Sequence, residues 1–155
     1  TVFAVLMVYS LQMFGQNTAF DEAFQKYAMK EGFVTINLSG EVFNMFFCND
    51  HKKGELKIGN VKIISAEDES IAKGIDFYNE IIPKLNMDDY LRLMDLKSAG
   101  EQMVILQKKV KNETKEFLIV SGGKENFMLY IEGSLNFDDV KKISEEMGSG
   151  DLSFN

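Results

Sequence analysis

Residues 101–131, EQMVILQKKVKNETKEFLIVSGGKENFMLYI, contain three apolar runs separated by two short polar turns. The runs occupy about residues 103–110, 116–120 and 127–131, and the turns lie at Asn112-Glu113 and at residues 122–126. Connections this short leave no room for a crossover helix, so each strand must pair antiparallel with the next one. The stretch therefore predicts a three-stranded antiparallel meander near the C-terminus.

Outside this meander, the spacing of apolar residues predicts two more strands and five helices. The strands are expected at residues 33–38 and 56–65, the second bent at Gly59-Asn60, and the helices at residues 20–31, 42–47, 71–82, 88–96 and 136–147. This order does not alternate strand and helix regularly, so a doubly wound parallel sheet fits less well than an α+β fold. We predict a two-layer sandwich, with helices packed on one face of a mostly antiparallel sheet.

The composition fits one globular domain. The chain has 155 residues, of which 45% are hydrophobic and 26% are charged, and it contains a single Pro. We assign one core to residues 16–147, followed by a flexible polar tail at residues 148–155. A net charge of -7 repels a phosphate backbone and the sequence has no local basic patch, so we expect no nucleic-acid partner. One Cys and one His exclude an internal disulfide and a His-rich metal site.

The first residues resemble a secretory signal. Residues 2–13, VFAVLMVYSLQM, carry no charge, and the first ionisable acid or base is Asp21. A membrane-spanning helix needs about 20 apolar residues, so this run is too short to span but matches the apolar region of a signal peptide. We interpret residues 1–15 as a truncated signal peptide cleaved near Gly15 or Gln16. We therefore expect a periplasmic or secreted mature chain with no membrane span. The alternative is a buried N-terminal element, which would favour an intracellular regulatory role.

Three acidic clusters are candidates for carboxylate chemistry: Glu67-Asp68-Glu69, Asp88-Asp89 and Asp138-Asp139. Paired carboxylates hold divalent cations or act as acid and base. Each cluster, however, falls at the start of a predicted helix, where carboxylates accept hydrogen bonds from free N–H groups and interact favourably with the helix dipole. We predict that all three clusters are helix caps. We accordingly assign no catalytic, cofactor-binding or metal-binding residue.

Two further motifs suggest chemistry but fit a structural role better. Cys48 and His51 are three residues apart, yet no third ligand lies nearby, and a Cys beside Phe46-Phe47 is typical of a small buried hydrophobic side chain. Gly122-Gly123-Lys124 lacks the upstream Gly and the following Ser or Thr of a phosphate-binding loop. We interpret this second motif as a hairpin turn.

Six short motifs, taken in their order and spacing, resemble the bacterial domain-of-unknown-function family number 4252. They are Lys30-Glu31-Gly32-Phe33, residues 64–69 (ISAEDE), Phe77-Tyr78-Asn79-Glu80, Tyr90-Leu91 with Leu93-Met94, Gly122-Gly123-Lys124 and Ile131-Glu132-Gly133. The resemblance extends over residues 20–147 and implies a small exported protein of a Gram-negative bacterium. It also hints at envelope signalling, because some members lie beside sigma-factor and anti-sigma genes, but it supplies no catalytic residue. Members with a lipid anchor carry a Cys directly after the signal, whereas the only Cys here is Cys48.

Two functions are compatible with these observations. The first is a non-enzymatic interaction domain of the periplasm or cell envelope with a protein partner, favoured by the export-like start and the absence of a nucleophile–base set. The second is a carboxylate-dependent hydrolase or isomerase that uses Asp68, Glu69 and Glu80, with Asp76 one turn from Glu80 on the same predicted helix. A cleft that joins two of these carboxylates would favour the enzyme.

Overall fold

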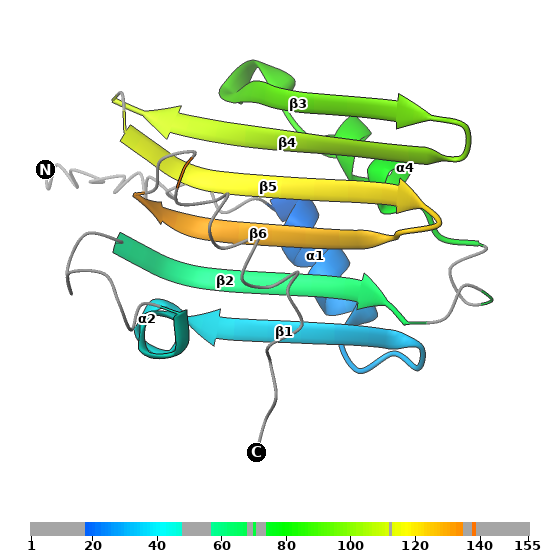
Figure 1. The fold of residues 1–155 in the computed structure, drawn as a ribbon, viewed down its shortest axis with the longest axis horizontal. Coiled ribbons are helices and arrows are strands. Elements are labelled where there is room, and N and C mark those ends of the chain that lie inside the picture. Colours follow the sequence, from blue (N-terminus) through cyan, green and yellow to red (C-terminus); the bar gives the residue numbers. More distant parts are fainter. Residues whose placement is uncertain are drawn as a thin grey trace, which may run out of the picture.

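Six strands form one antiparallel sheet in the computed structural model (Figure 1). The strands are β1 (Phe33–Ser39), β2 (Lys57–Ala66), β3 (Tyr90–Ser98), β4 (Glu101–Val110), β5 (Glu113–Gly123) and β6 (Phe127–Ser134). Their order in the sheet is β1-β2-β6-β5-β4-β3, so β1 and β3 are its edges. The structure describes residues 18–47, 57–67, 70, 74–111, 113–134 and 138.

The predicted meander is confirmed. β4 pairs antiparallel with β5, for example through Ile105 and Ile119, and β5 pairs antiparallel with β6 through Ile119 and Leu129. The turn between β5 and β6 begins at Gly123, whose φ of 101° favours glycine. Local alternation and short connections were therefore sufficient to define this half of the sheet.

β3 corrects the prediction of a helix at residues 88–96. Residues Met87–Asp89 form only a short 3-10 turn, η2, and Tyr90–Ser98 pairs antiparallel with β4. Leu, Met and Arg favour helices in isolation, but β3 is joined to β4 by the tight turn Ala99-Gly100, whose glycine has a φ of 87°. Pairing with β4 across this turn overrides the helix propensity of the segment.

β2 joins the N-terminal strands to the meander. Ile63 of β2 lies opposite Ile36 of β1 on one side and opposite Leu129 of β6 on the other. Both predicted strands are present, and a register shift between Ile58 and Asn60 confirms the predicted bend. The centre of the sheet is thus built from strands that are far apart in the sequence.

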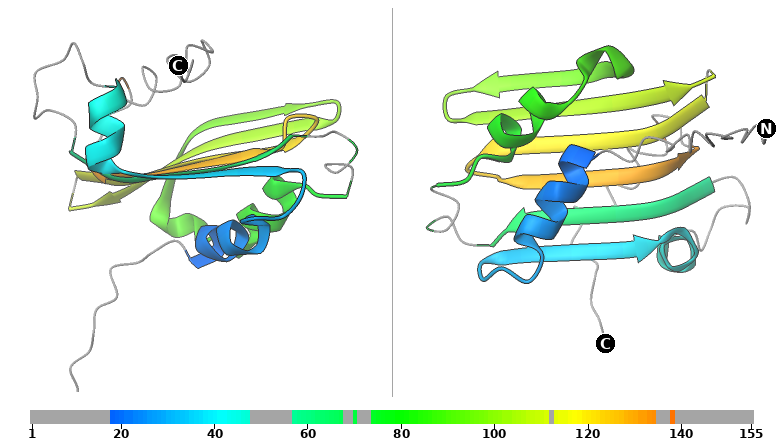
Figure 2. Two further views of the ribbon diagram at one scale, coloured as in Figure 1. Left: turned by 90° about the horizontal axis from the view of Figure 1, so that it is seen from below. Right: turned by 180° about the vertical axis from the view of Figure 1, so that it is seen from behind.

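α1 (Thr18–Tyr27) and α4 (Phe77–Ile81) lie on one side of the sheet, which we call the helix-covered face (Figure 2). α4 ends before the 3-10 turn η1 (Ile82–Lys84), which contains Pro83, and corresponds to the second half of the helix predicted at residues 71–82. Phe20 of α1 packs against Tyr130, and Tyr27 packs edge-on against Phe77, each with ring centroids 5.1 Å apart. These aromatic contacts attach both helices to the sheet and to each other.

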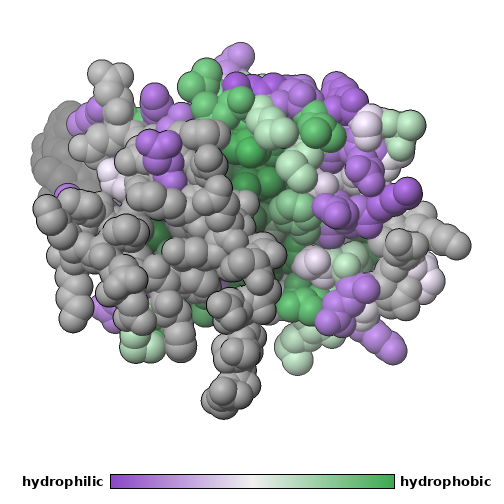
Figure 3. All heavy atoms as spheres, in the orientation of Figure 1, coloured by the Kyte–Doolittle hydropathy of each residue, from purple (hydrophilic) through white to green (hydrophobic). Residues whose placement is uncertain are grey.

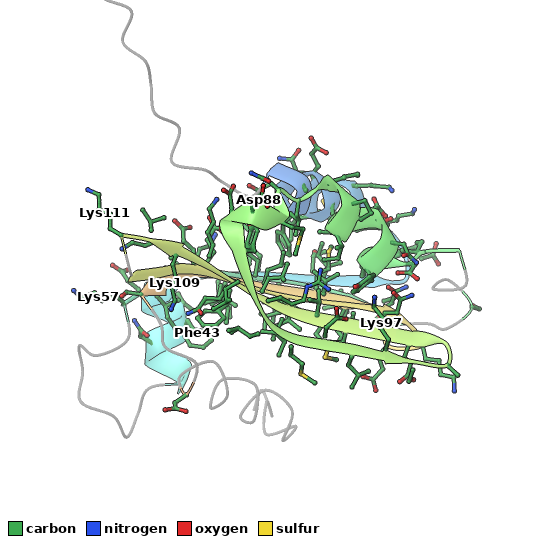
Figure 4. The ribbon with its side chains drawn as sticks, turned by 90° about the horizontal axis from the view of Figure 1, so that it is seen from above. Phe43, Lys57, Asp88, Lys97, Lys109 and Lys111 are labelled. Carbon is green, nitrogen blue, oxygen red and sulfur yellow. The ribbon has the colours of Figure 1, made fainter. Side chains whose placement is uncertain are left out.

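α2 (Gly40–Phe47) corrects the prediction that the helices pack on one face. It lies on the opposite side of the sheet, which we call the second face, and buries Phe43 between itself and the strands (Figure 4). Gly40 follows β1 without a loop, and a Cβ atom there would lie 1.7 Å from the carbonyl oxygen of Ile58. Glycine therefore permits the chain to turn against β2 and places α2 at one end of the second face.

Several predictions concern residues outside the described part of the chain. They are the signal peptide at residues 1–15, Cys48 and His51, Asp68 and Glu69, Asp139, the C-terminal helix apart from Asp138, and the tail at residues 148–155. The boundaries of the predicted domain remain predictions.

Candidate functional site

Of the three predicted acidic caps, the described residues test the one at Asp88-Asp89, and its side chains do not cap a helix. Asp88 and Asp89 lie in η2, which has no side-chain cap hydrogen bond, and Asp88 precedes β3 (Figure 4). Glu67 and Asp138 are exposed. The prediction for Asp88 is wrong because η2 is only three residues long and the chain then continues as β3, so no full helix follows the carboxylate. Among the described residues, no group of three His, Cys, Asp or Glu is arranged to hold a metal ion.

Among the described helices, a carboxylate does cap the start of α4. Asp76 accepts a hydrogen bond from the backbone N–H of Asn79 at 3.0 Å and one from the Asn79 side-chain amide at 2.8 Å. Buried Asn126 fixes the same helix start, since its Oδ1 accepts from the backbone N–H of Phe77 at 3.0 Å and its Nδ2 donates to the carbonyl of Ile75. The turn before β6 therefore positions the start of α4.

The Gly122-Gly123-Lys124 motif is explained by the same contact. A Cβ atom at Gly122 would lie 2.1 Å from Asp76 Oδ1 and 2.9 Å from Tyr78 Cβ. The glycine thus allows β5 to pass directly beneath α4, and Gly123 begins the turn to β6. The hairpin interpretation of this motif is confirmed.

Glu80 of α4 connects the two helices of the helix-covered face. Its carboxylate accepts hydrogen bonds from Tyr27 Oη at 2.6 Å and from Lys26 Nζ at 2.7 Å. Burial by itself would raise the pKa of Glu80, but the hydrogen bonds from Lys26 and Tyr27 outweigh it and hold the pKa below its ordinary value. Glu80 is therefore ionised at neutral pH and engaged in a structural contact, as Asp76 is. The two described carboxylates of the enzyme hypothesis share no hydrogen-bond partner.

A buried carboxylate that the sequence analysis did not single out lies on the helix-covered face. Glu116 of β5 is 6% exposed, accepts a hydrogen bond from Tyr90 Oη at 3.1 Å, and stands directly opposite Glu132 of β6. Burial raises the pKa of Glu116, Lys108 and Tyr90 counteract this, and Glu132 adds to the rise. Burial, together with the charge of Glu116, also raises the pKa of Tyr90. Glu116 is the described carboxyl group closest to what acid–base chemistry requires, but its hydrogen-bond partner is a phenol rather than a second acid or base.

Exposed apolar side chains gather on β3. Leu91, Met94 and Leu96, which we call the β3 strip, are 53%, 41% and 39% exposed. Met94 and Leu96 lie opposite Ile105 and Met103 of β4, which pack against the core of the second face. The strip therefore belongs to the second face, where a hydrophobic band runs across the strands (Figure 3).

The β3 strip was not predicted because residues 88–96 were assigned to a helix, and the shared face of Leu91, Met94 and Leu96 depends on their lying in a strand. A usable signal is present in the sequence. Two runs that can pair, residues 90–98 and 101–110, flank the dipeptide Ala99-Gly100, a spacing typical of a β-hairpin.

Within the described residues, no helix has the length and apolar character needed to cross a membrane. A family model described as "Domain of unknown function (DUF4252)" matches residues 27–143, a range that begins at the end of α1 and includes all six strands. No curated protein and no solved structure matches the chain.

Proposed function

We propose that this chain, which belongs to the DUF4252 family, is a non-enzymatic interaction domain of the bacterial cell envelope. The observation that supports an interaction role is the β3 strip. Large apolar side chains grouped on one exposed element are more typical of a binding surface than single exposed residues scattered over a protein.

The energetic argument rests on the partial exposure of these side chains. Leu91, Met94 and Leu96 are each about half exposed. Complete burial of one such side chain from water is worth about 1.5–3 kcal/mol, so covering the exposed part of each would contribute about 1 kcal/mol. The three side chains of the strip therefore supply about 3 kcal/mol, so a specific contact also needs further interactions, such as those of the neighbouring Met103 and Ile105 and of the strand backbone, to offset the cost of association.

The proposed architecture is a two-layer sandwich in which α1 and α4 form the layer opposite the sheet. In this arrangement both faces contribute buried core, and the part of the second face near β3 supplies the binding surface. The carboxylate-enzyme hypothesis has less support, since Asp76 caps α4 and Glu80 is held by Tyr27 and Lys26.

The envelope location is supported by the uncharged run at residues 2–13 and by the exported character of the family that the sequence resembles. The test is to express the protein from its own gene, fractionate the cells and determine the N-terminus. We expect a periplasmic or secreted chain that begins near Gln16. An unprocessed chain in the cytoplasm would rule out the envelope role.

The interaction role is tested by placing a photo-crosslinking amino acid at Leu96 in the intact protein in living cells. The matched control position is Met29, a large apolar residue that is fully exposed but lies outside the sheet. We expect discrete covalent adducts from Leu96 and none from Met29. Adducts at neither position, or equal adducts at both, would count against an interaction surface on β3.

A further inference from the structure

The edge strand β3 has a residue pattern that is complementary to itself. We infer that β3 pairs antiparallel with the β3 of a second copy of this chain, about a two-fold axis that passes between Leu93 and Met94. The inference rests on the proposed function and deepens it by naming the partner of the β3 strip.

The backbone of β3 is available for such pairing within the described sheet. β3 is hydrogen-bonded to β4 along one side and has no described strand on its other side. An edge strand presents a row of N–H and C=O groups that can pair with another strand, and exposed apolar residues on the edge favour this pairing. The opposite edge, β1, has no residue among the exposed large hydrophobic side chains, whereas β3 has the three residues of the strip.

A bulge at the centre of β3 makes its two halves equivalent. Arg92 lies opposite Leu106 and Met94 opposite Ile105, so Leu93 is an extra residue in β3. Leu93 and Met94 consequently both belong to the second face. Moving outward from this pair, Arg92 and Asp95 lie on the helix-covered face, and Leu91 and Leu96 lie on the second face. Counted outward from Leu93 and Met94, successive side chains therefore lie on the two faces of the sheet in the same order toward both ends of β3.

This symmetry matters because directly opposed residues of antiparallel strands share a face of the sheet. When a two-fold axis perpendicular to the sheet passes between Leu93 and Met94, the two residues of every cross-strand pair lie on the same face. The resulting cross-strand pairs are Leu93 with Met94, Arg92 with Asp95, Leu91 with Leu96, and Tyr90 with Lys97.

The chemistry of these pairs is complementary. The apolar residues meet one another on the second face, so the two β3 strips join into one larger apolar surface. On the other face each Arg92 meets the Asp95 of the second copy, which gives two oppositely charged pairs, and at the ends each Lys97 meets an aromatic ring. Figure 4 shows Lys97 far along β3 from Asp88, so these outer contacts would flank the central ones.

Within one chain, Arg92 already forms an ion pair with Asp95, and both side chains remain partly exposed. In the paired strands, Arg92 and Asp95 of the two copies together form a group of four charges that alternate in sign across the axis. Each of these four charges has a neighbour of opposite sign, as an edge-to-edge contact between copies requires at its centre.

Charge reversal tests this arrangement. In Arg92→Asp, each new carboxylate would face Asp95 of the second copy, and in Asp95→Arg, each new guanidinium would face Arg92. We expect each variant to raise the Kd of self-association, measured by analytical ultracentrifugation, by about tenfold or more, since two attractive pairs become repulsive. An equimolar mixture of the two variants restores both attractive pairs and should associate as tightly as the wild type.

The same experiment includes two internal controls. In the doubly substituted chain, Arg92→Asp with Asp95→Arg, positions 92 and 95 still carry opposite charges, both within each chain and between the two copies. This chain should self-associate like the wild type. The mixture distinguishes loss of pairing from loss of folding, because two chains that cannot fold do not restore association. A wild-type chain that stays monomeric, or a mixture of correctly folded variants that stays monomeric, would overturn the inference.

The register is tested independently by disulfide formation in a Cys48→Ser background. A chain with Leu91→Cys mixed with a chain with Leu96→Cys should give a cross-linked heterodimer on mild oxidation. The mixture of Leu91→Cys with Met29→Cys should not. Equal yields from both mixtures would reject the proposed register.

Failure of this inference can be separated from failure of the proposed function. A monomeric chain that still gives adducts from Leu96 to another protein would reject pairing between copies while supporting an interaction role for the β3 strip. A monomeric chain without such adducts would reject both.

Discussion

Glu80 and Glu116 lie on the same face of the sheet, yet folding shifts their pKa values in opposite directions. For Glu80, hydrogen bonds from Lys26 and Tyr27 outweigh burial and lower the pKa. Its contribution to stability is present above the unfolded pKa and is lost as the pH falls through the folded pKa. For Glu116, burial dominates and raises the pKa. Its contribution is present below the unfolded pKa and is lost as the pH rises through the folded pKa.

This difference predicts that Glu116→Gln stabilises the protein at neutral pH. The amide oxygen still accepts the hydrogen bond from Tyr90, no charge has to be buried, and the repulsion from Glu132 disappears. We expect a higher free energy of unfolding than the wild type at pH 7 and little or no gain at pH 4, measured by urea denaturation at both values. Glu132→Gln, at an exposed position, is the control and should give a smaller gain. An equal loss of stability at both pH values would show that the charged form of Glu116 is not penalised.

The sequence could not reveal Glu116 or Asn126 as special residues. The hydrogen bond between Tyr90 and Glu116 joins residues 26 positions apart, and the one between Phe77 and Asn126 joins residues 49 positions apart. Locally, Glu116 resembles an ordinary polar residue at the start of a strand, and Asn126 resembles an ordinary turn residue. Their roles arise only when distant elements meet.

At the scale of elements, the start of α4 depends on its fit against β5. Asp76→Ala removes the side-chain cap and should lower the free energy of unfolding by about 1 kcal/mol. Gly122→Ala should cost more, because the new methyl group meets Tyr78 Cβ as well as the Asp76 carboxylate. The double variant should lose less than the sum of the two, since the substitution of Asp76 removes one of the clashing groups.

The matched control for this cycle is Gly74→Ala. A Cβ atom at Gly74 has no atom within 4 Å, so we expect little change in the free energy of unfolding measured by denaturant titration. If Gly122→Ala were as harmless as Gly74→Ala, the close approach of β5 to α4 would not constrain the fold.

The elements that the sequence predicted correctly are those whose signal is local. Alternating residues and short turns define β4 to β6, and the Gly59-Asn60 pair marks the bend in β2. β3 was misassigned because its composition favours a helix, and the information that overrides it lies in its partner strand. The candidate surface was missed for the same reason, since the β3 strip exists only in a strand.

For the molecule as a whole, each face of the sheet carries its own hydrophobic cluster. The helix-covered face holds α1 and α4 through buried aromatic contacts, whereas the second face has α2 at one end and the β3 strip at the other edge of the sheet. Binding at the β3 strip would leave the packing of α1 and α4 on the helix-covered face unchanged. Because the side chains of the β3 strip are exposed, substitutions there are suitable tests of the proposed interaction role.

The same reasoning predicts what removal of the N-terminus should do. The described core begins with Ala19 and Phe20 in α1, and residues 1–15 are interpreted as a signal that the mature protein does not need. A chain that begins at Gln16 should therefore have the same free energy of unfolding as the full chain, measured by urea denaturation.

The control is a chain that begins after α1, at Ala28, which takes Phe20, Ala23 and Tyr27 out of the core. Loss of buried aromatic side chains costs about 3–5 kcal/mol each, so this shorter chain should not fold stably. If the chain that begins at Gln16 were also destabilised by several kcal/mol, residues 2–13 would belong to the core. The export proposal would then lose its main support, and an intracellular regulatory role would become the better hypothesis.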